Sequence, residues 1–528
     1  MSYLDTPRLH FSGSFFSNPS TQNNSKASFP PGATVVPMWN PMGMHWFYLK
    51  DCTVKTAIGP DGNAAPADAA VGGQVETTND PAYGRMVDID PDYQQASQIW
   101  GAQFKVSLKG GGGEFKGKLQ TATLRDLWLA RVLNLPGNLR LAGASGVYQS
   151  VFKELTFQSA SGSPILTALS KASAIAIKFV VYGYDATQGS PTFNQGRIVG
   201  TIGPFGSADG DETSGMDLGV HFLQARRMED AGSRAFGKAP FKLNPGKKKL
   251  TIDLGNCIPE VSPGGARNNF GTMEAVILLP SAKPEVLGTL DYSKGHYEQT
   301  AGIEDIKLTD KQVSLLKKNP LGLRVSSPST AVIMNERPKG LYIDATEIAF
   351  RLNSGDSQSV TLVATEFGVA TSGRKLDLKL ISGTPPSGIS FPSSVTAGTG
   401  FSITAADPGN PRGAVDRQLY QVGYYSGGPA ASFLEGTLII KVYDPFRPKS
   451  LDVATIMPIL AQYAQVYPFM KARMDIGDLK VVKANAAAIL KSINWDEEDP
   501  RYMPVTRDLS SEKKLALRAF LLLLLMMP

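Results

Sequence analysis

Apolar and polar residues alternate in short runs along the first half of this chain, which is the pattern of half-buried β-strands. The run Gly110–Gly113 separates two such segments and predicts a hairpin turn, whereas the spacing over Leu124–Leu133 predicts a helix. Together these patterns predict an irregular β domain over residues 1–260. The expected strands are Leu4–Gly13, Trp46–Ile58, Tyr83–Pro91, Phe104–Leu108, Ile175–Tyr184, Arg197–Ile202 and Lys249–Leu254.

The middle of the chain changes character twice. Residues 261–330 are mixed and predict a connecting region with one short helix near Thr309–Lys318. Residues 331–445 then show short strands, several of them separated by Pro and Gly clusters, which is typical of an immunoglobulin-like β-sandwich. The strands expected in it are Ala331–Met334, Ser359–Ala364, Leu376–Ile381, Gly400–Ala405, Gln418–Tyr424 and Gly436–Val442.

The C-terminal residues 446–528 follow a helical period instead. Apolar residues recur at helical spacing over Leu451–Tyr467 and Val481–Ile493. The following stretch, Trp495–Leu509, is polar and contains two prolines that forbid a continuous helix, so we interpret it as a stiff connector. A last helix follows, with Ser510 as its N-cap. The fold class predicted overall is mainly β, with an α-helical C-terminal tail.

The end of that last helix, Ala519–Met527, is wholly apolar. A membrane span needs about 20 such residues, so we expect no span. A helix that is apolar all round must be covered by protein. We therefore expect it to pack on its own domains, on a second copy of the chain, or on a partner protein.

Charge and cysteine content narrow the classes further. The formal net charge of +6 is small for 528 residues and its cations are scattered, so nucleic acid is not an expected partner. The two cysteines, Cys52 and Cys257, form neither a disulfide framework nor a metal cluster. The N-terminus lacks a basic region followed by an apolar core, which predicts a cytoplasmic protein.

Motifs for metal and nucleophilic chemistry are missing from the sequence. None of the four histidines has a glutamate three residues before it, as a carboxylate-bridged di-iron site requires. The sequence also lacks His-Glu-x-x-His and Gly-x-Ser-x-Gly motifs. We therefore expect no metal and no cofactor.

The best polar cluster of the first domain combines Arg8, His10, Asp88 and Asp90, each pair on one face of a strand. In one interpretation, Arg8 pairs with Asp88 or Asp90 in a buried network that joins two strands. In the other, Arg8 binds a ligand carboxylate while the catalytic residues His10, Asp88 and Asp90 handle a proton. Trp46 is either part of the core or an aromatic surface for that ligand.

Several short stretches occur in the order found in a known family. The chain resembles the N-terminal region of the iminophenyl-pyruvate dimer synthases, or chromopyrrolate synthases, of violacein-type pathways. The matching stretches are Leu4-Asp5-x-Pro7-Arg8-x-His10-Phe11, Arg85-x-Val87-Asp88-x-Asp90-Pro91, Gln98-Ile99, Asp253-Leu254-x-Asn256-x-Ile258-Pro259, Tyr467-Pro468-Phe469-Met470 and Tyr502-Met503-Pro504-x-Thr506-Arg507-Asp508-Leu509-Ser510.

That family couples two imines derived from aromatic 2-oxo acids, and its redox chemistry is associated with a ferritin-like helical domain after the matching region. We expect that domain to be absent here, so the resemblance implies the fold and a biosynthetic context. Two functions stay open. One is a secondary-metabolism protein that acts on an aromatic or imine-like small molecule without a metal. The other is a non-catalytic binding or scaffold protein that partners a separate redox domain, or a second copy, through its C-terminal helix.

Overall fold

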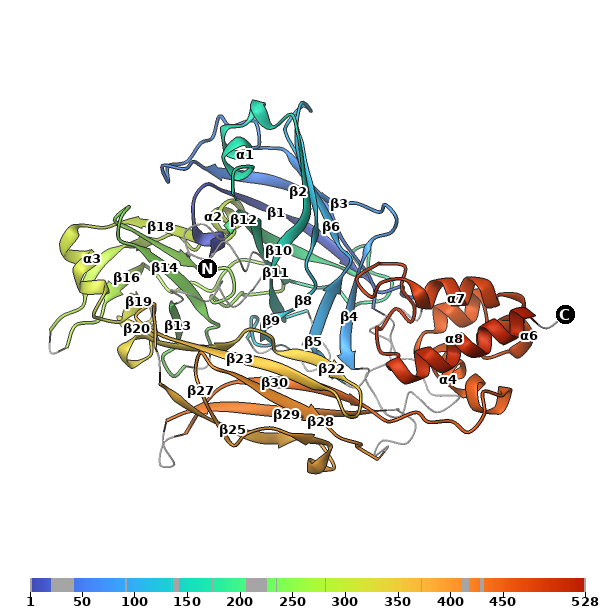
Figure 1. Cartoon of the computed structure of the whole chain (residues 1–528). Helices are drawn as coiled ribbons and strands as arrows, with labels where there is room; N and C mark the ends of the chain where they lie inside the picture. The colour runs from blue at the N-terminus through green and yellow to red at the C-terminus, as the bar shows by residue number, and fades with distance from the viewer. Residues whose placement is uncertain are drawn as a thin grey trace.

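The computed structural model describes residues 2–526 except 20–41, 91–92, 134, 136–141, 173, 206–225, 234, 281, 372, 410–416 and 428–431. Pro91, His221 and Met527 lie outside the described residues. Within them, the strands form four sheets and most of the helical residues gather in the C-terminal tail (Figure 1). The prediction of a mainly β protein with a helical C-terminal tail is confirmed.

The first sheet has 12 strands, which lie between residues 8 and 205. Strand β1 pairs with both β12 and β2, so eight strands close on themselves around a core that includes Phe11, Phe47 and Phe179. Large aromatic side chains fill such an enclosed space efficiently. The strands are β1 (Arg8–Ser17), β2 (Trp46–Ile58), β3 (Gln74–Thr77), β4 (Gly84–Asp90), β5 (Tyr93–Trp100), β6 (Gln103–Ser107), β7 (Glu114–Leu119), β8 (Ala122–Thr123), β9 (Arg125–Trp128), β10 (Ser145–Gln158), β11 (Ala174–Tyr182) and β12 (Gln195–Phe205).

Two local predictions in this sheet have opposite outcomes. The hairpin turn at Gly110–Gly113 is confirmed, because it joins the antiparallel pair β6 and β7 and three of its glycines have positive φ. The helix predicted over Leu124–Leu133 is wrong, because this segment contains β9, which pairs with β10. Asp126 has a φ of 47°, which a right-handed helix excludes, and Leu127 and Leu129 are exposed.

The second sheet has eight strands and combines residues 226–253 with residues 273–336. The boundary expected after residue 260 therefore falls inside its span. We expected Ala331–Met334 in the sandwich, but this segment pairs with two strands of the second sheet, and Met334 is buried in the core of that sheet. The strands are β13 (Arg226–Asp230), β14 (Ala239–Asn244), β15 (Lys249–Asp253), β16 (Met273–Ile277), β17 (Glu285–Leu290), β18 (Ile303–Lys307), β19 (Leu321–Val325) and β20 (Ala331–Glu336).

The short helix predicted near Thr309–Lys318 is confirmed as α3 (Asp310–Leu316). Thr309 caps it, and the side chain of Gln312 completes a capping box.

The predicted β-sandwich is present and begins at Leu341. Its two five-stranded sheets share one core, which buries the inward side chains of both. Its immunoglobulin-like class stays a prediction. One sheet contains β21 (Leu341–Ala345), β23 (Ser357–Glu366), β24 (Val369–Ala370), β26 (Ile389–Ser390) and β28 (Gly400–Ala405). The other contains β22 (Ala349–Leu352), β25 (Lys375–Ser382), β27 (Ser394–Thr396), β29 (Arg417–Ser426) and β30 (Phe433–Tyr443).

The helical tail stands to one side of the β structure, next to β4 (Figure 1). Its helices share their own hydrophobic core, and the stretch Trp495–Leu509 connects two of them. Among the described residues, no helix combines the length and the apolar character that a membrane crossing requires. The helices are α4 (Val453–Val466), α5 (Pro468–Arg473), α6 (Leu479–Ala484), α7 (Ala486–Asn494) and α8 (Ser511–Met526).

Candidate functional site

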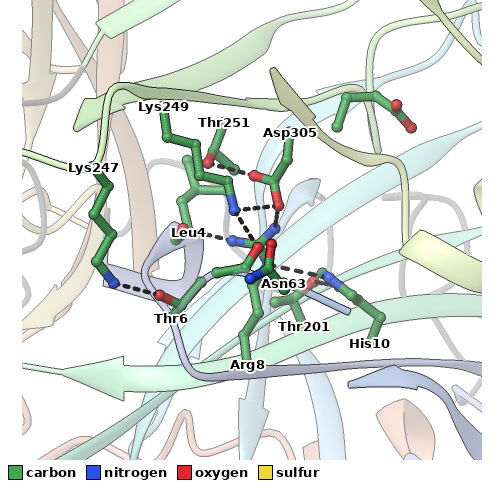
Figure 2. A network of polar contacts seen from close by, with 12 residues as sticks. Leu4, Thr6, Arg8, His10, Asn63, Thr201, Lys247, Lys249, Thr251 and Asp305 are labelled. Carbon is green, nitrogen blue, oxygen red and sulfur yellow. Dashed lines mark hydrogen bonds and ion pairs between the residues drawn. The ribbon is translucent and has the colours of Figure 1, made fainter. Parts of the chain in front are cut away.

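Arg8 and His10 lie together in a buried polar network (Figure 2). The Nε–H of Arg8 donates to His10 Nε2 at 3.1 Å, so the ring proton lies on His10 Nδ1 and donates to Thr201 Oγ1 at 3.0 Å. Arg8 also forms an ion pair with Asp305 of β18, which Lys249 contacts at 2.7 Å. Burial and the neighbouring Arg8 charge hold the pKa of His10 well below its ordinary value, so this ring stays neutral.

The predicted pairing of Arg8 with Asp88 or Asp90 is wrong. Arg8 lies opposite Ile58 at one end of β2, whereas β4 pairs with the other end, where Trp46 lies opposite Arg85. Because β2 is 13 residues long, the two halves of the expected cluster lie at opposite ends of a long strand. Arg8 instead pairs across to the second sheet.

Asp88 and Asp90 have separate surroundings. Ser97 Oγ donates to Asp88 Oδ1 at 2.6 Å, and burial raises the pKa of Asp88 to about 6. Asp90 is fully buried, 3.7 Å from the Nζ of Lys441, which lies at the same distance from Asp508 of the connector. The catalytic roles expected for His10, Asp88 and Asp90 stay predictions.

Trp46 belongs to an aromatic row on the outer side of the first sheet. Its ring meets Tyr83 edge to face at 5.9 Å, Tyr83 stacks on Tyr48 at 4.4 Å, and Tyr48 stacks on Phe16 at 4.8 Å. These rings therefore contact one another along the row. The ligand-binding role expected for Arg8 and Trp46 stays a prediction.

Among the described residues, no group of three His, Cys, Asp or Glu side chains is arranged to hold a metal ion. Cys52 and Cys257 are both buried, and burial raises the pKa of the Cys52 thiol to about 12. The expected absence of a metal and a cofactor stays a prediction.

Two buried arginines hold the main chain of the connector, and one of them belongs to the first sheet. Arg85 of β4 donates from Nε to the carbonyl oxygen of Pro500 at 2.9 Å. Arg507 turns back on the connector and donates to the carbonyl oxygens of Val505 at 2.6 Å and Asp499 at 2.9 Å. The prediction of a link between two helices is therefore confirmed, and Arg85 anchors the link to the β structure.

An apolar cavity of about 70 Å³ lies between this connector and the helices. Among the described residues that line it, none carries a charged side chain. They are Leu460, Tyr463, Tyr467, Met470, Met474, Ile476, Ile489, Ser492, Ile493, Met503, Pro504, Val505, Thr506, Leu509 and Leu517.

Four of these side chains carry a hydroxyl, and three of the four are satisfied. Tyr463 donates to the carbonyl oxygen of Asp508 at 3.1 Å, and Thr506 donates to the Asp508 carboxylate at 2.5 Å. Ser492 donates to a carbonyl of its own helix at 2.8 Å. The fourth hydroxyl, that of Tyr467, is buried and has no hydrogen-bond partner among the described residues. A buried hydroxyl left in this state costs about 1–3 kcal/mol.

The surroundings of Tyr467 keep its proton in place. Burial raises the pKa of Tyr467 to about 12, although the positive charges of Arg85 and Arg507 oppose that shift. The ring centroids of His45 and Tyr467 lie 5.7 Å apart. Burial lowers the pKa of His45 to about 4, so the His45 ring is neutral at pH 7. At neutral pH, the Tyr467 hydroxyl is therefore a hydrogen-bond donor without an acceptor among the described residues.

Sequence reasoning did not predict Tyr467 as a site residue. Tyr467 was noted only as part of the helical segment Leu451–Tyr467 and of one stretch that carries the family resemblance. A weaker signal exists in the helical spacing. Leu460, Tyr463 and Tyr467 recur at intervals of three and four residues, which places them on one helix face. That pattern predicts shared burial, and it does not distinguish a packed tyrosine from one that faces a cavity.

A second, polar cavity of about 30 Å³ lies among strands of the first sheet, the second sheet and the sandwich. Ion pairs engage its charged side chains, which identifies it as a structural junction. These pairs are Lys178 with Asp253 at 2.8 Å, Arg125 with Asp344 at 3.2 Å and Lys238 with Asp126 at 2.8 Å.

Comparisons with known proteins give no family. No protein-family model matches the chain, and no curated protein matches it. Among solved structures, the chain is similar at 9% identity to the three N-terminal domains of the Highly Immunogenic Outer Capsid protein of bacteriophage RB49, over 63% of this chain and 94% of that one, with a TM-score of 0.14.

A second similarity, at 8% identity, is to Salmonella alpha-2-macroglobulin reacted with methylamine, over 97% of this chain and 35% of that one, with a TM-score of 0.17. Neither score indicates a shared fold, so the cavity has to be interpreted from its own geometry.

Proposed function

We propose that this protein binds a small, largely apolar organic molecule in the cavity of its helical tail. The observation that carries the proposal is the cavity itself, an apolar space kept open between the connector and four helices. Apolar walls with a few placed polar groups are the usual character of small-molecule sites. Because the lining side chains described include no acid or base, the site is suited to binding rather than to proton transfer.

The walls of the cavity combine a rigid side with an adaptable side. The connector forms the rigid side, since Arg85 and Arg507 fix its main chain. Met470 and Met474 form much of the adaptable side. Unbranched methionine side chains rearrange easily around ligands of different shape, so the site can enlarge beyond its unfilled volume.

The resemblance supports an aromatic or imine-like molecule as the ligand. Two of the stretches that carry it, residues 467–470 and 502–510, contribute to the lining of the cavity. Under this proposal the protein takes part in secondary metabolism as a cytoplasmic, metal-independent binding protein. Catalysis on the same molecule would need groups that the described lining does not contain.

The test uses a neutral aromatic probe, acetophenone, titrated into the full chain by calorimetry. Ser492→Leu places a larger side chain at the cavity and should weaken binding at least tenfold. Ser314→Leu in α3 is the matched control, because Ser314 also donates to a carbonyl of its own helix, at 2.9 Å, and lies far from the cavity in the sequence. Equal binding to both variants and to the wild type would contradict the proposal.

A second function, docking of a partner protein, is favoured by the outer face of α8. The inner face of this helix, which includes Leu517, Phe520 and Leu521, is buried in the tail. On the outer face, Leu515 is 63% exposed and Met526 is 81% exposed. The expectation that the apolar run is covered by protein therefore holds for one face of the helix within the described chain.

The outer face has the spacing of a helix-binding surface. Leu515, Ala519, Leu522 and Met526 follow one another at intervals of four, three and four residues, as in a coiled-coil seam. Arg518 is exposed beside them, whereas the acidic residue of this helix, Glu512, bonds to the main chain of Phe446. We propose that the occupant is an amphipathic helix with carboxylates on its flanks, supplied by a separate redox protein rather than by a second copy.

A further inference from the structure

We infer that Tyr467 selects the ligand, and that the cavity takes neutral molecules whose carbonyl oxygen or imine nitrogen accepts a hydrogen bond from the Tyr467 hydroxyl. This inference rests on the proposed function and adds to it the chemical class of the ligand. Four of the side chains that line the cavity carry a hydroxyl. Three of them are satisfied by the protein, and only the Tyr467 hydroxyl still has a hydrogen bond to donate among the described lining residues.

The positive charges near Tyr467 favour an electron-rich acceptor. Arg85 and Arg507 are both buried, and neither forms an ion pair within the described part of the chain. Their positive charges act on the Tyr467 hydroxyl. An oxygen or nitrogen with a partial negative charge would therefore gain both a hydrogen bond and a favourable potential.

The same arrangement disfavours a carboxylate. The guanidinium groups of Arg85 and Arg507 already donate to main-chain carbonyls, including those of Pro500 and Val505, so they are not arranged as a fork around the cavity. The lining side chains are apolar apart from their hydroxyls. Moving an ionised group into such surroundings without a direct cationic partner is costly, so a neutral acceptor is the better fit.

The experiment compares three probes of similar shape with the full chain by calorimetry: acetophenone, isopropenylbenzene and benzoate. Isopropenylbenzene replaces the carbonyl oxygen of acetophenone with a methylene group. A hydrogen bond from Tyr467 should give acetophenone about a fivefold lower Kd than isopropenylbenzene. Benzoate should bind more weakly than acetophenone.

Two variants assign the difference to one hydroxyl. Tyr467→Phe should bring the Kd values of acetophenone and isopropenylbenzene together. Tyr463→Phe is the matched control, because the Tyr463 hydroxyl is already engaged by Asp508, and it should keep the fivefold preference.

The outcomes separate this inference from the proposed function. If acetophenone and isopropenylbenzene bind equally to the wild type, the selection by Tyr467 is wrong, although the cavity still binds ligand. If benzoate binds most tightly, the neutral class is wrong. If none of the three binds at millimolar concentration, both the inference and the proposed function fail.

Discussion

The Nζ of Lys441 in β30 lies 3.7 Å from Oδ2 of Asp508 in the connector, and both side chains are almost completely buried. Asp90 of β4 lies on the same ammonium group at 3.7 Å. One buried lysine thus joins the first sheet, the sandwich and the connector. The carboxylate of Asp508 also receives the hydrogen bond of Thr506, which lines the apolar cavity. The wall of the cavity is therefore continuous with the contact that attaches the tail to the β structure.

The first prediction concerns this junction. Lys441→Met should lower the free energy of unfolding by about 3–5 kcal/mol, because it removes a buried cation that contacts two buried carboxylates. Urea denaturation at neutral pH measures the change. Lys375→Met on β25 is the control, since that lysine is exposed and should change stability by less than about 0.5 kcal/mol. Equal losses in both variants would show that the buried position of Lys441 has no special role.

The second prediction concerns Asp88 and pH. Its pKa in the folded protein is about 6, above the ordinary value of 3.8, so the folded state holds its proton more tightly than the unfolded state. The resulting loss of stability grows as the pH rises from about 4 to 6 and is complete above that range. Asp88→Asn keeps an oxygen for Ser97 and removes the charge. It should be more stable than the wild type by about 1–2 kcal/mol at pH 7.5 and no more stable at pH 4. A benefit that is the same at both pH values would contradict the assigned protonation.

Every strand predicted from the local pattern overlaps a strand of the structure, because strand alternation is a property of neighbouring residues, but the pattern identified fewer than half of the strands described. Trp46–Ile58 was predicted with the bounds that β2 has. The errors come from long-range pairing. The sequence of Ala331–Met334 predicts a strand equally well in the second sheet or in the sandwich. Only its pairing partners decide which of the two it joins. The helix expected over Leu124–Leu133 failed because a positive φ at Asp126 is not visible as a period in the sequence.

The site was harder to predict for the same reason. Arg8, His10, Asp88 and Asp90 are all buried or partly buried polar residues, as their pattern suggests. Their grouping depended on the length and register of β2, which separates Arg8 from Asp88. The cavity forms only when α4, α5, α7, α8 and the connector meet, so no single stretch of sequence predicts it. The connector itself was predicted correctly, because two prolines act locally.

The third prediction compares two tyrosines of the cavity. Tyr463→Phe should lower the free energy of unfolding by about 1 kcal/mol, because the carbonyl of Asp508 loses a donor. Tyr467→Phe should leave stability unchanged or raise it, because it removes a hydroxyl that has no partner among the described residues. Chemical denaturation of the two variants gives both values. A larger loss in Tyr467→Phe than in Tyr463→Phe would mean that the Tyr467 hydroxyl is satisfied in solution.

The fourth prediction concerns the outer face of α8. A fluorescent helical peptide with leucines at coiled-coil spacing and glutamates on its flanks should bind the wild type, and a version with lysine flanks should bind at least tenfold more weakly. Leu522→Glu should abolish binding of the glutamate peptide without unfolding the tail, because Leu522 is 49% exposed. Fluorescence anisotropy measures these affinities.

Sedimentation velocity on the wild type completes that test. The chain should remain monomeric at micromolar concentration if the outer face of α8 binds a helix from another protein. Self-association that Leu522→Glu removes would identify a second copy as the occupant instead.

The most direct test of the central claim follows the methionines of the cavity by nuclear magnetic resonance. With ¹³C-labelled methionine methyl groups, Met470, Met474 and Met503 report on the cavity, and Met273 and Met334 in the core of the second sheet serve as internal controls. Addition of acetophenone should shift the three cavity signals in a saturable manner and leave the two control signals in place. Cavity signals that do not move, or that move no more than those of Met273 and Met334, would contradict the claim that this protein holds a small molecule in its helical tail.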